Sequence, residues 1–167
     1  MTTKKSAIVT NFTAVPRVAN STQEMGGRMR TAQGSIALAT TDLDAADIVL
    51  LAPIPTNASI ISIKLASDDM DSGSPALLWD VGLHYMDGTA KDADFYATDI
   101  TLGQAATAFT EYRFEAADIN TTGSFVWEDA GDTSDPGGTY YLSMTVSTTP
   151  ATAVAGDLSF IVQYVLD

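Results

Sequence analysis

The feature that most constrains the fold is a series of short runs in which apolar and polar residues alternate. A period of two is typical of β-strands that bury one face, and turn-forming residues bound each run. In the clearest run, over residues 77–86, Trp79, Val81, Leu83 and Tyr85 share one face, which we expect to point inward. Together with one continuous apolar run, residues 47–52, these runs predict about eight strands. We expect them over residues 35–40, 47–52, 59–66, 77–86, 92–98, 109–115, 139–147 and 157–166.

Turn residues separate these runs and leave little room for helices. Pro53 and Pro55 end the second run because proline cannot donate to a strand ladder, and Asp87-Gly88 is a hairpin signal. The weak helix candidate is a brief turn over 105–108, and residues 124–128 form a short aromatic segment. About eight strands without helical crossovers predict an all-β, antiparallel β-sandwich. A jelly roll fits that strand number best, and an immunoglobulin-like sandwich is the alternative.

The first 33 residues have a different character. They show little periodicity, and Pro16 and the pair Gly26-Gly27 favour an extended segment. We therefore divide the chain into an N-terminal arm, residues 1–33, and a β-sandwich domain, residues 34–167. The arm is too rich in apolar groups for a purely solvated tail, so we expect it to pack on its own body or on a neighbouring subunit. Its predicted partner-binding residues are Lys4, Lys5, Ile8, Val9, Phe12, Val15, Arg17, Val18, Arg28 and Arg30.

Charge is distributed unevenly between these two parts. The arm holds five of the eight basic residues and only one acidic residue, Glu24, in a chain whose net charge is −13. An acidic body repels DNA and anionic membranes, so neither nucleic acid nor a membrane is an expected partner. No apolar run is long enough to span a bilayer, and the N-terminus lacks the apolar region of a signal peptide. The absence of cysteine excludes disulfides and thiolate metal sites.

Residues suited to catalysis are few. His84 is the only histidine, and the alternation places it opposite the apolar face, where a surface or interface position is the default. No glycine-serine elbow, phosphate-binding loop or dinucleotide fingerprint accompanies it. We therefore expect no catalytic residues, no cofactor and no enzymatic activity, although a small hydrolase using His84 stays as a minor alternative.

Three acidic clusters could suggest a metal. Calcium prefers six to eight oxygen ligands, but no cluster has the spacing of an EF-hand loop, so solvated turns are the expected state and no metal site is predicted. The clusters are Asp68, Asp69 and Asp71; Asp92 and Asp94; and Asp129, Asp132 and Asp135.

Several longer strings carry a resemblance to a known group. Residues 34–49 (GSIALATTDLDAADIV), 53–60 (PIPTNASI), 135–142 (DPGGTYYL) and 156–160 (GDLSF) are similar to segments of small virion proteins of tailed bacteriophages. Within that group the profile resembles capsid decoration, or cement, proteins.

The resemblance implies a compact β domain, often a homotrimer, that sits on the capsid exterior at threefold or quasi-threefold points. There it would clamp neighbouring major capsid subunits, which makes the major capsid protein and the chain itself the expected partners and the virion surface the expected location. No catalytic residues accompany this group. A head-fibre or tail component is the alternative, as is a host-glycan-binding module that would use exposed Trp127, Tyr141 and Tyr96.

Overall fold

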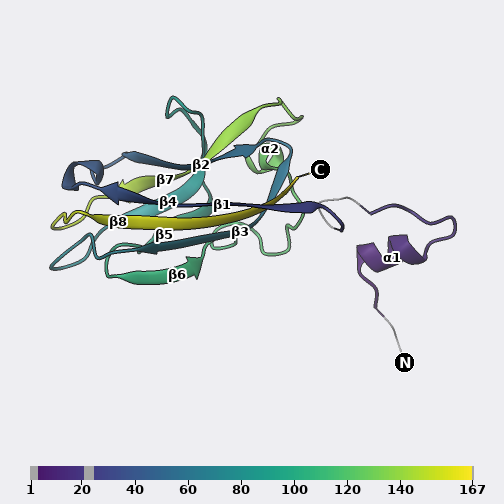
Figure 1. Cartoon of the computed structure of the whole chain (residues 1–167), viewed down its shortest axis with the longest axis horizontal. Helices are drawn as coiled ribbons and strands as arrows, with labels where there is room; N and C mark the ends of the chain where they lie inside the picture. Colours follow the sequence, from purple (N-terminus) through teal and green to yellow (C-terminus); the bar gives the residue numbers. More distant parts are fainter. Residues whose placement is uncertain (1–3, 21–24, 167) are drawn as a thin grey trace.

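The computed structural model describes residues 4–20 and 25–166, and these residues build an antiparallel β-sandwich with a short N-terminal helix beside it (Figure 1). Two four-stranded sheets pack face to face, and the segment that carries the helix lies beyond the end of the sandwich where the C-terminus also lies. The elements are α1 (Ala7–Thr13), β1 (Arg28–Leu38), the 3₁₀ turn η1 (Thr40–Asp42), β2 (Ile48–Pro55), β3 (Ala58–Ser67), β4 (Leu78–His84), β5 (Ala90–Ile100), β6 (Thr107–Glu111), α2 (Val126–Asp129), β7 (Thr139–Thr148) and β8 (Gly156–Leu166).

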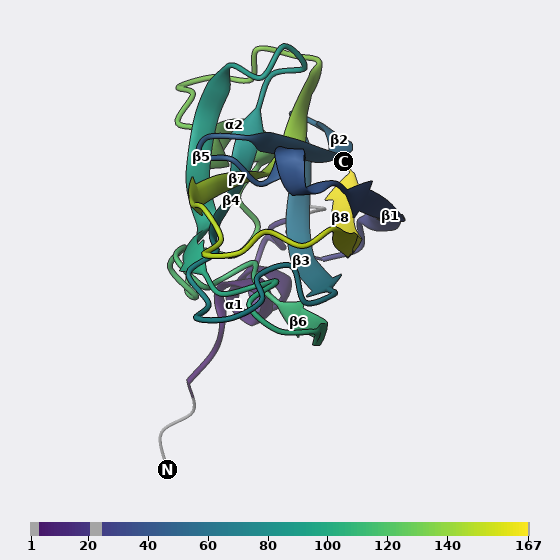
Figure 2. The same cartoon turned by 90° about the vertical axis from the view of Figure 1, so that its left-hand side faces the viewer.

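The strand order identifies the sandwich as a jelly roll. One sheet has the order β1-β8-β3-β6, the other has the order β2-β7-β4-β5, and every neighbouring pair is antiparallel. Successive strands alternate between the sheets, and the tight turn at Thr56 and Asn57 leads from β2 in one sheet to β3 in the other. The exception is the passage from β4 to β5, which stays within one sheet. Figure 2 shows β1, β8, β3 and β6 following one another along one layer. Eight strands wound as two Greek keys define the jelly roll, so the preferred prediction is confirmed.

The core fills the space between the two sheets. Trp79, Val81 and Leu83 of β4 are fully buried, as the alternation predicts, and they belong to the same hydrophobic core as Ile63 and Val162 of the opposite sheet. Burial of each such side chain stabilises the fold by roughly 1.5–3 kcal/mol relative to exposure. Tyr85, predicted on the same inward face, lies past the end of β4 and is 41% exposed.

Two local predictions differ from the structure. Strand β1 begins at Arg28, so residues 28–33 of the predicted arm belong to the sheet. The helical turn expected over 105–108 is wrong, because β6 begins at Thr107 and pairs with β3. The aromatic segment 124–128 overlaps the short helix α2, and the Glu128 carboxylate accepts the backbone N–H of Phe125, the residue before the helix.

Candidate functional site

The N-terminal segment has a defined local structure. Helix α1 begins after Ser6, whose hydroxyl accepts the backbone N–H of Val9 at 3.3 Å and so satisfies one of the unpaired donors of the first turn. A helix of seven residues is too short to be stable by itself in water, and none of its residues is buried. Its stability therefore depends on further contacts.

Asn20 supplies several of those contacts. Its Oδ1 atom accepts a hydrogen bond from Asn11 Nδ2 at 2.9 Å, and its Nδ2 atom donates to the Ile8 carbonyl at 3.2 Å. The backbone N–H of Val18 donates to the Asn11 carbonyl at 3.2 Å. These bonds fold residues 14–20 back along the helix, and we call residues 4–20 the hook.

The hook presents an apolar surface to solvent. Val15 is 97% exposed, while Val9, Phe12 and Val18 are each about half exposed. The guanidinium of Arg17 lies 3.9 Å from the centre of the Phe12 ring, a cation–π distance, so a positive charge covers one side of this surface. So many exposed apolar side chains on so short a segment are typical of a surface that contacts another molecule.

Ile8 connects the hook to the sandwich. It lines a cavity of about 290 Å³ together with Ser59 and Ile61 of β3, Phe114 and the loop over 121–123. Of the residues predicted to bind a partner, Ile8 is therefore placed against the chain's own body, whereas Val9, Phe12, Val15 and Val18 are not buried by it.

The predicted basic residues fall into two groups. Lys4, Lys5 and Arg17 lie in the hook and are exposed; Lys5 Nζ donates to Thr13 Oγ1 at 3.4 Å. Arg28 and Arg30 lie instead in β1, at the edge of a sheet, and are exposed there. The structure therefore does not gather the ten predicted residues into one surface.

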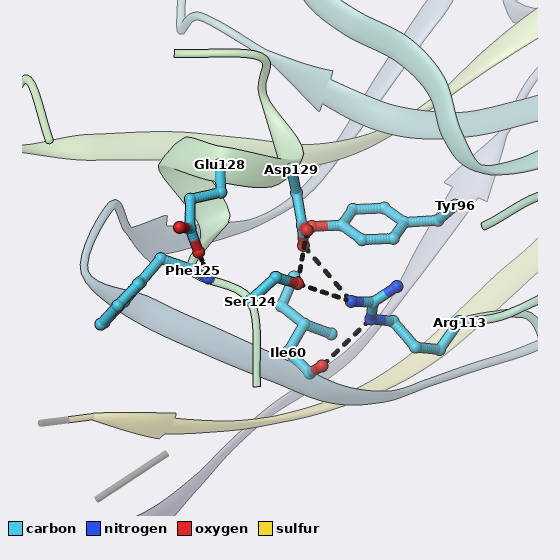
Figure 3. A network of polar contacts seen from close by, with 7 residues as sticks. All are labelled: Ile60, Tyr96, Arg113, Ser124, Phe125, Glu128 and Asp129. Atoms are coloured by element: carbon cyan, nitrogen blue, oxygen red, sulfur yellow. Dashed lines mark hydrogen bonds and ion pairs between the residues drawn. The ribbon is translucent and has the colours of Figure 1, made fainter. Parts of the chain in front are cut away.

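A buried polar cluster, which sequence analysis did not find, lies inside the sandwich (Figure 3). The Asp129 carboxylate accepts hydrogen bonds from Ser124 Oγ at 2.7 Å and Tyr96 Oη at 2.9 Å, and Arg113 Nη2 lies 3.4 Å from it. Arg113 Nε donates to the Ile60 carbonyl at 3.0 Å, which ties the cluster to β3. Strand periodicity does not reveal this cluster, because its ion pair joins residues that are separated along the chain.

The surroundings of this cluster indicate a structural role. Arg113 and Asp129 side chains are each 1% exposed, and burial raises the pKa of Asp129 despite its hydrogen bonds and the Arg113 charge. The rings of Tyr96 and Phe114 lie 4.8 and 4.7 Å from the guanidinium carbon, so the cation is also enclosed by aromatic faces. With both charged side chains almost fully buried, the cluster fastens α2 and its loop to β3.

His84 is buried, contrary to the surface position expected for it. It is 2% exposed, and its Nδ1 atom lies 2.7 Å from Ser143 Oγ. Ser143 Oγ also donates to the Gly82 carbonyl at 3.1 Å, and burial lowers the pKa of His84. Between Val81 and Leu83 the pairing of β4 with β5 shifts in register, and the β5 backbone passes directly against Gly82, so this outer face is covered by protein.

The acidic clusters are divided among separate structural roles. Asp71 is 1% exposed and accepts backbone N–H groups of Leu77 at 2.8 Å and Thr152 at 3.1 Å. Burial alone would raise the pKa of Asp71, but its backbone hydrogen bonds outweigh that effect and lower the pKa. Asp132 pairs with Lys91 and accepts the Tyr140 hydroxyl at 2.6 Å. Within residues 4–20 and 25–166, no three histidine or acidic side chains are grouped as a metal would require.

The aromatic residues considered for glycan binding do not form an exposed platform. Tyr96 is fully buried in the polar cluster, so its predicted exposure is wrong. Trp127 and Tyr141 are partly exposed, and Trp127 stacks on Phe125 with ring centres 6.0 Å apart. No helix in the described part of the chain is long and apolar enough to cross a membrane.

Comparison with known proteins places this fold beside chains of two phage capsids. A chain of the "Cyanophage Pam1 capsid asymmetric unit" superposes with a TM-score of 0.62 and 24% identity, over 100% of both chains. A chain of the "Capsid of Ralstonia phage GP4" gives a TM-score of 0.62 and 22% identity, over 84% of this chain and 86% of that one. No protein-family model and no curated protein matches the sequence. At these identities the comparisons establish a shared fold.

Proposed function

We propose that this chain is a structural protein of a tailed-bacteriophage virion that binds the outer surface of an icosahedral capsid and bridges neighbouring major capsid subunits. In this role it is a cement, or decoration, protein. Its fold matches chains of two phage capsids, one of them over the whole of both chains, and this likeness supports a capsid location.

The observation that carries the bridging role is the apolar surface of the hook. Val9, Phe12, Val15 and Val18 are exposed on a short segment that lies beyond the end of the sandwich (Figure 1). Burying these four side chains on a capsid subunit would stabilise the complex by roughly 25 cal/mol per Å² of apolar area. The positive charges of Lys4, Lys5 and Arg17 would chiefly govern encounter rate and register on an acidic partner surface.

The assembled capsid is a suitable target for such a ligand. A protein that binds the closed lattice but not the separate subunits stabilises the lattice by mass action. A homotrimer at threefold or quasi-threefold points would present three hooks at once, and the effective concentration of the second and third hooks multiplies weak contacts. The sandwich acts in this proposal as a rigid spacer.

Deletion of residues 1–26 tests the proposal while leaving β1 intact. Full-length and truncated proteins are mixed with capsids from a phage mutant that lacks this protein, and binding is measured by co-sedimentation. The full-length protein is expected to bind and to raise the temperature at which the capsids open, and the truncated protein is expected to do neither. Equal binding by a truncated protein whose circular dichroism retains the β signature would refute the bridging role.

A head-fibre or tail component is the competing assignment, since it would use the same fold. Gold-labelled full-length protein, imaged on particles, separates the two: label over the capsid faces supports the cement role, and label at the tail or at a single vertex refutes it.

A further inference from the structure

The four edge strands of the sandwich differ in how well they are protected against pairing with another strand. Edge β2 contains Pro53 and Pro55 and has a register shift after Leu50. Edge β5 has three register shifts against β4 and carries charged residues, and edge β6 is only five residues long. Prolines, bulges, charges and short length are the devices that keep sheet edges from joining.

Edge β1 has none of these devices over most of its length. It is eleven residues long, and its register with β8 is unbroken from Arg28 to Leu38. No proline and no charged residue occurs between Thr31 and Leu38. Only one side of β1 is paired in the described structure, so a flat row of backbone donors and acceptors faces outward.

Charge along this edge is self-complementary. Arg28 and Arg30 are exposed at its beginning, whereas a groove of about 370 Å³ lies at its other end. Residues 36–38 of β1, residues 48–50 of β2 and the acidic side chains of Asp42 and Asp47 line that groove. One edge therefore begins with cations and ends beside carboxylates.

From these features we infer that a second copy of this chain pairs with the β1 edge, antiparallel and across a twofold axis centred on Gln33. In this register Arg30 of one copy lies opposite Ile36 of the other, and Arg28 lies opposite Leu38. Directly opposed residues of an antiparallel pair point to the same face. Because Ile36 and Leu38 turn toward the core side, where the groove opens, the arginines of each copy point toward Asp42 and Asp47 of the other.

The proposed contact does not oppose like charges and joins two four-stranded sheets into one of eight strands. An interface built on the same patch of both copies is the arrangement most common among homo-oligomers. It is separate from the hook and does not rest on the proposed function. On a capsid it would link neighbouring oligomers that the hooks hold in place.

The chain is well suited to a cross-linking test because it contains no cysteine. Facing residues of an antiparallel pair have Cα atoms about 4.5 or 5.5 Å apart, within the range that a disulfide spans. The full-length variant Gln33→Cys, oxidised mildly, is expected to give a disulfide-linked dimer. Gln163→Cys is the matched control, since Gln163 lies on the same outer face but in the interior strand β8, and it is expected to stay monomeric on a denaturing gel. Equal or lower dimer yield from Gln33→Cys overturns the inference.

A charge test addresses the register. Gln33→Glu and Gln33→Lys each place like charges face to face, and each is expected to weaken self-association in sedimentation by up to about fivefold. A one-to-one mixture of the two variants brings opposite charges together and is expected to restore it. A mixture that associates no more tightly than the single variants overturns the twofold pairing at Gln33.

Discussion

The Nη2 atom of Arg113 lies 3.4 Å from the Oδ2 atom of Asp129, and only 1% of each side chain is exposed. This pair joins the loop that follows β6 to helix α2. Among the described residues it is the only ion pair that is fully buried. The single Arg113 side chain thus holds both Ser124 of the preceding loop and helix α2 against the core.

Replacing Arg113 tests how strongly this contact stabilises the fold. Arg113→Met keeps much of the side-chain volume but leaves the Asp129 carboxylate buried without its cation. We expect the free energy of unfolding to fall by about 3–5 kcal/mol, as for other broken buried pairs. Urea denaturation followed by tryptophan fluorescence measures the change.

Two companion variants make that measurement specific. Lys91→Met breaks a partly exposed pair and is expected to cost less than about 1 kcal/mol. The double variant Arg113→Met with Asp129→Asn removes both charges and should recover part of the loss. A cost for Arg113→Met no larger than that for Lys91→Met would contradict the structural role.

The buried His84 predicts a pH dependence of stability. Burial lowers the pKa of the folded-state imidazole below its ordinary value of 6.5. Between the lowered pKa and about 6.5 the unfolded chain binds a proton that the folded chain does not, so stability falls as pH falls through this window. Above it, His84 is neutral in both states and contributes no pH dependence.

The variant His84→Asn isolates this effect, since the chain has no other histidine and asparagine can keep a hydrogen bond to Ser143. Denaturation midpoints are compared at pH 7.5 and pH 5 for both proteins. We expect the wild type to lose more stability than the variant on acidification. Burial raises the pKa of Asp80 and Asp92, which gives the opposite slope, but that contribution is common to both proteins and cancels.

Sequence alternation predicted the strands well where one face is buried and the other is solvated. It failed at His84 because the β5 backbone covers the outer face of β4. The alternation within one strand does not reveal which other segments pack against its outer face. It also missed the beginning of β1, since this edge strand has few apolar residues and follows two glycines. The buried pair of Arg113 and Asp129 was missed because it joins residues that only the finished fold brings together.

Gly82 is the residue that lets β5 cover β4. A Cβ atom at this position would clash with the backbone carbonyl groups of Asp92 and Ala93, and backbone cannot move aside as easily as a side chain can. We expect Gly82→Ala to destabilise the fold by about 3 kcal/mol, at the upper end of ordinary overpacking. Thermal unfolding measures the loss, and hydrogen exchange should show it first in β5.

Gly34→Ala provides the comparison for Gly82. Its Cβ would meet only the Phe160 ring, at 3.0 Å, near an open edge, so a smaller loss is expected. If both alanine variants unfold at the same temperature, the close approach of the β5 backbone to Gly82 does not determine how much stability is lost at this position.

The final prediction concerns the hook and is tested with the full-length chain. Phe12→Asp and Val9→Asp each place a carboxylate on the exposed apolar surface, where neither residue supports the sandwich. Burying a half-exposed aromatic or aliphatic side chain stabilises a complex by about 1.4 kcal/mol, so each change is expected to weaken capsid binding by about tenfold.

Ile119→Asp is the matched control, because Ile119 is 71% exposed but lies in a loop of the body. Binding to capsids lacking the protein is measured by co-sedimentation, and the thermal unfolding temperature of all three variants should match that of the wild type. Loss of binding in Ile119→Asp, with binding retained in the two hook variants, would move the contact surface from the hook to the sandwich.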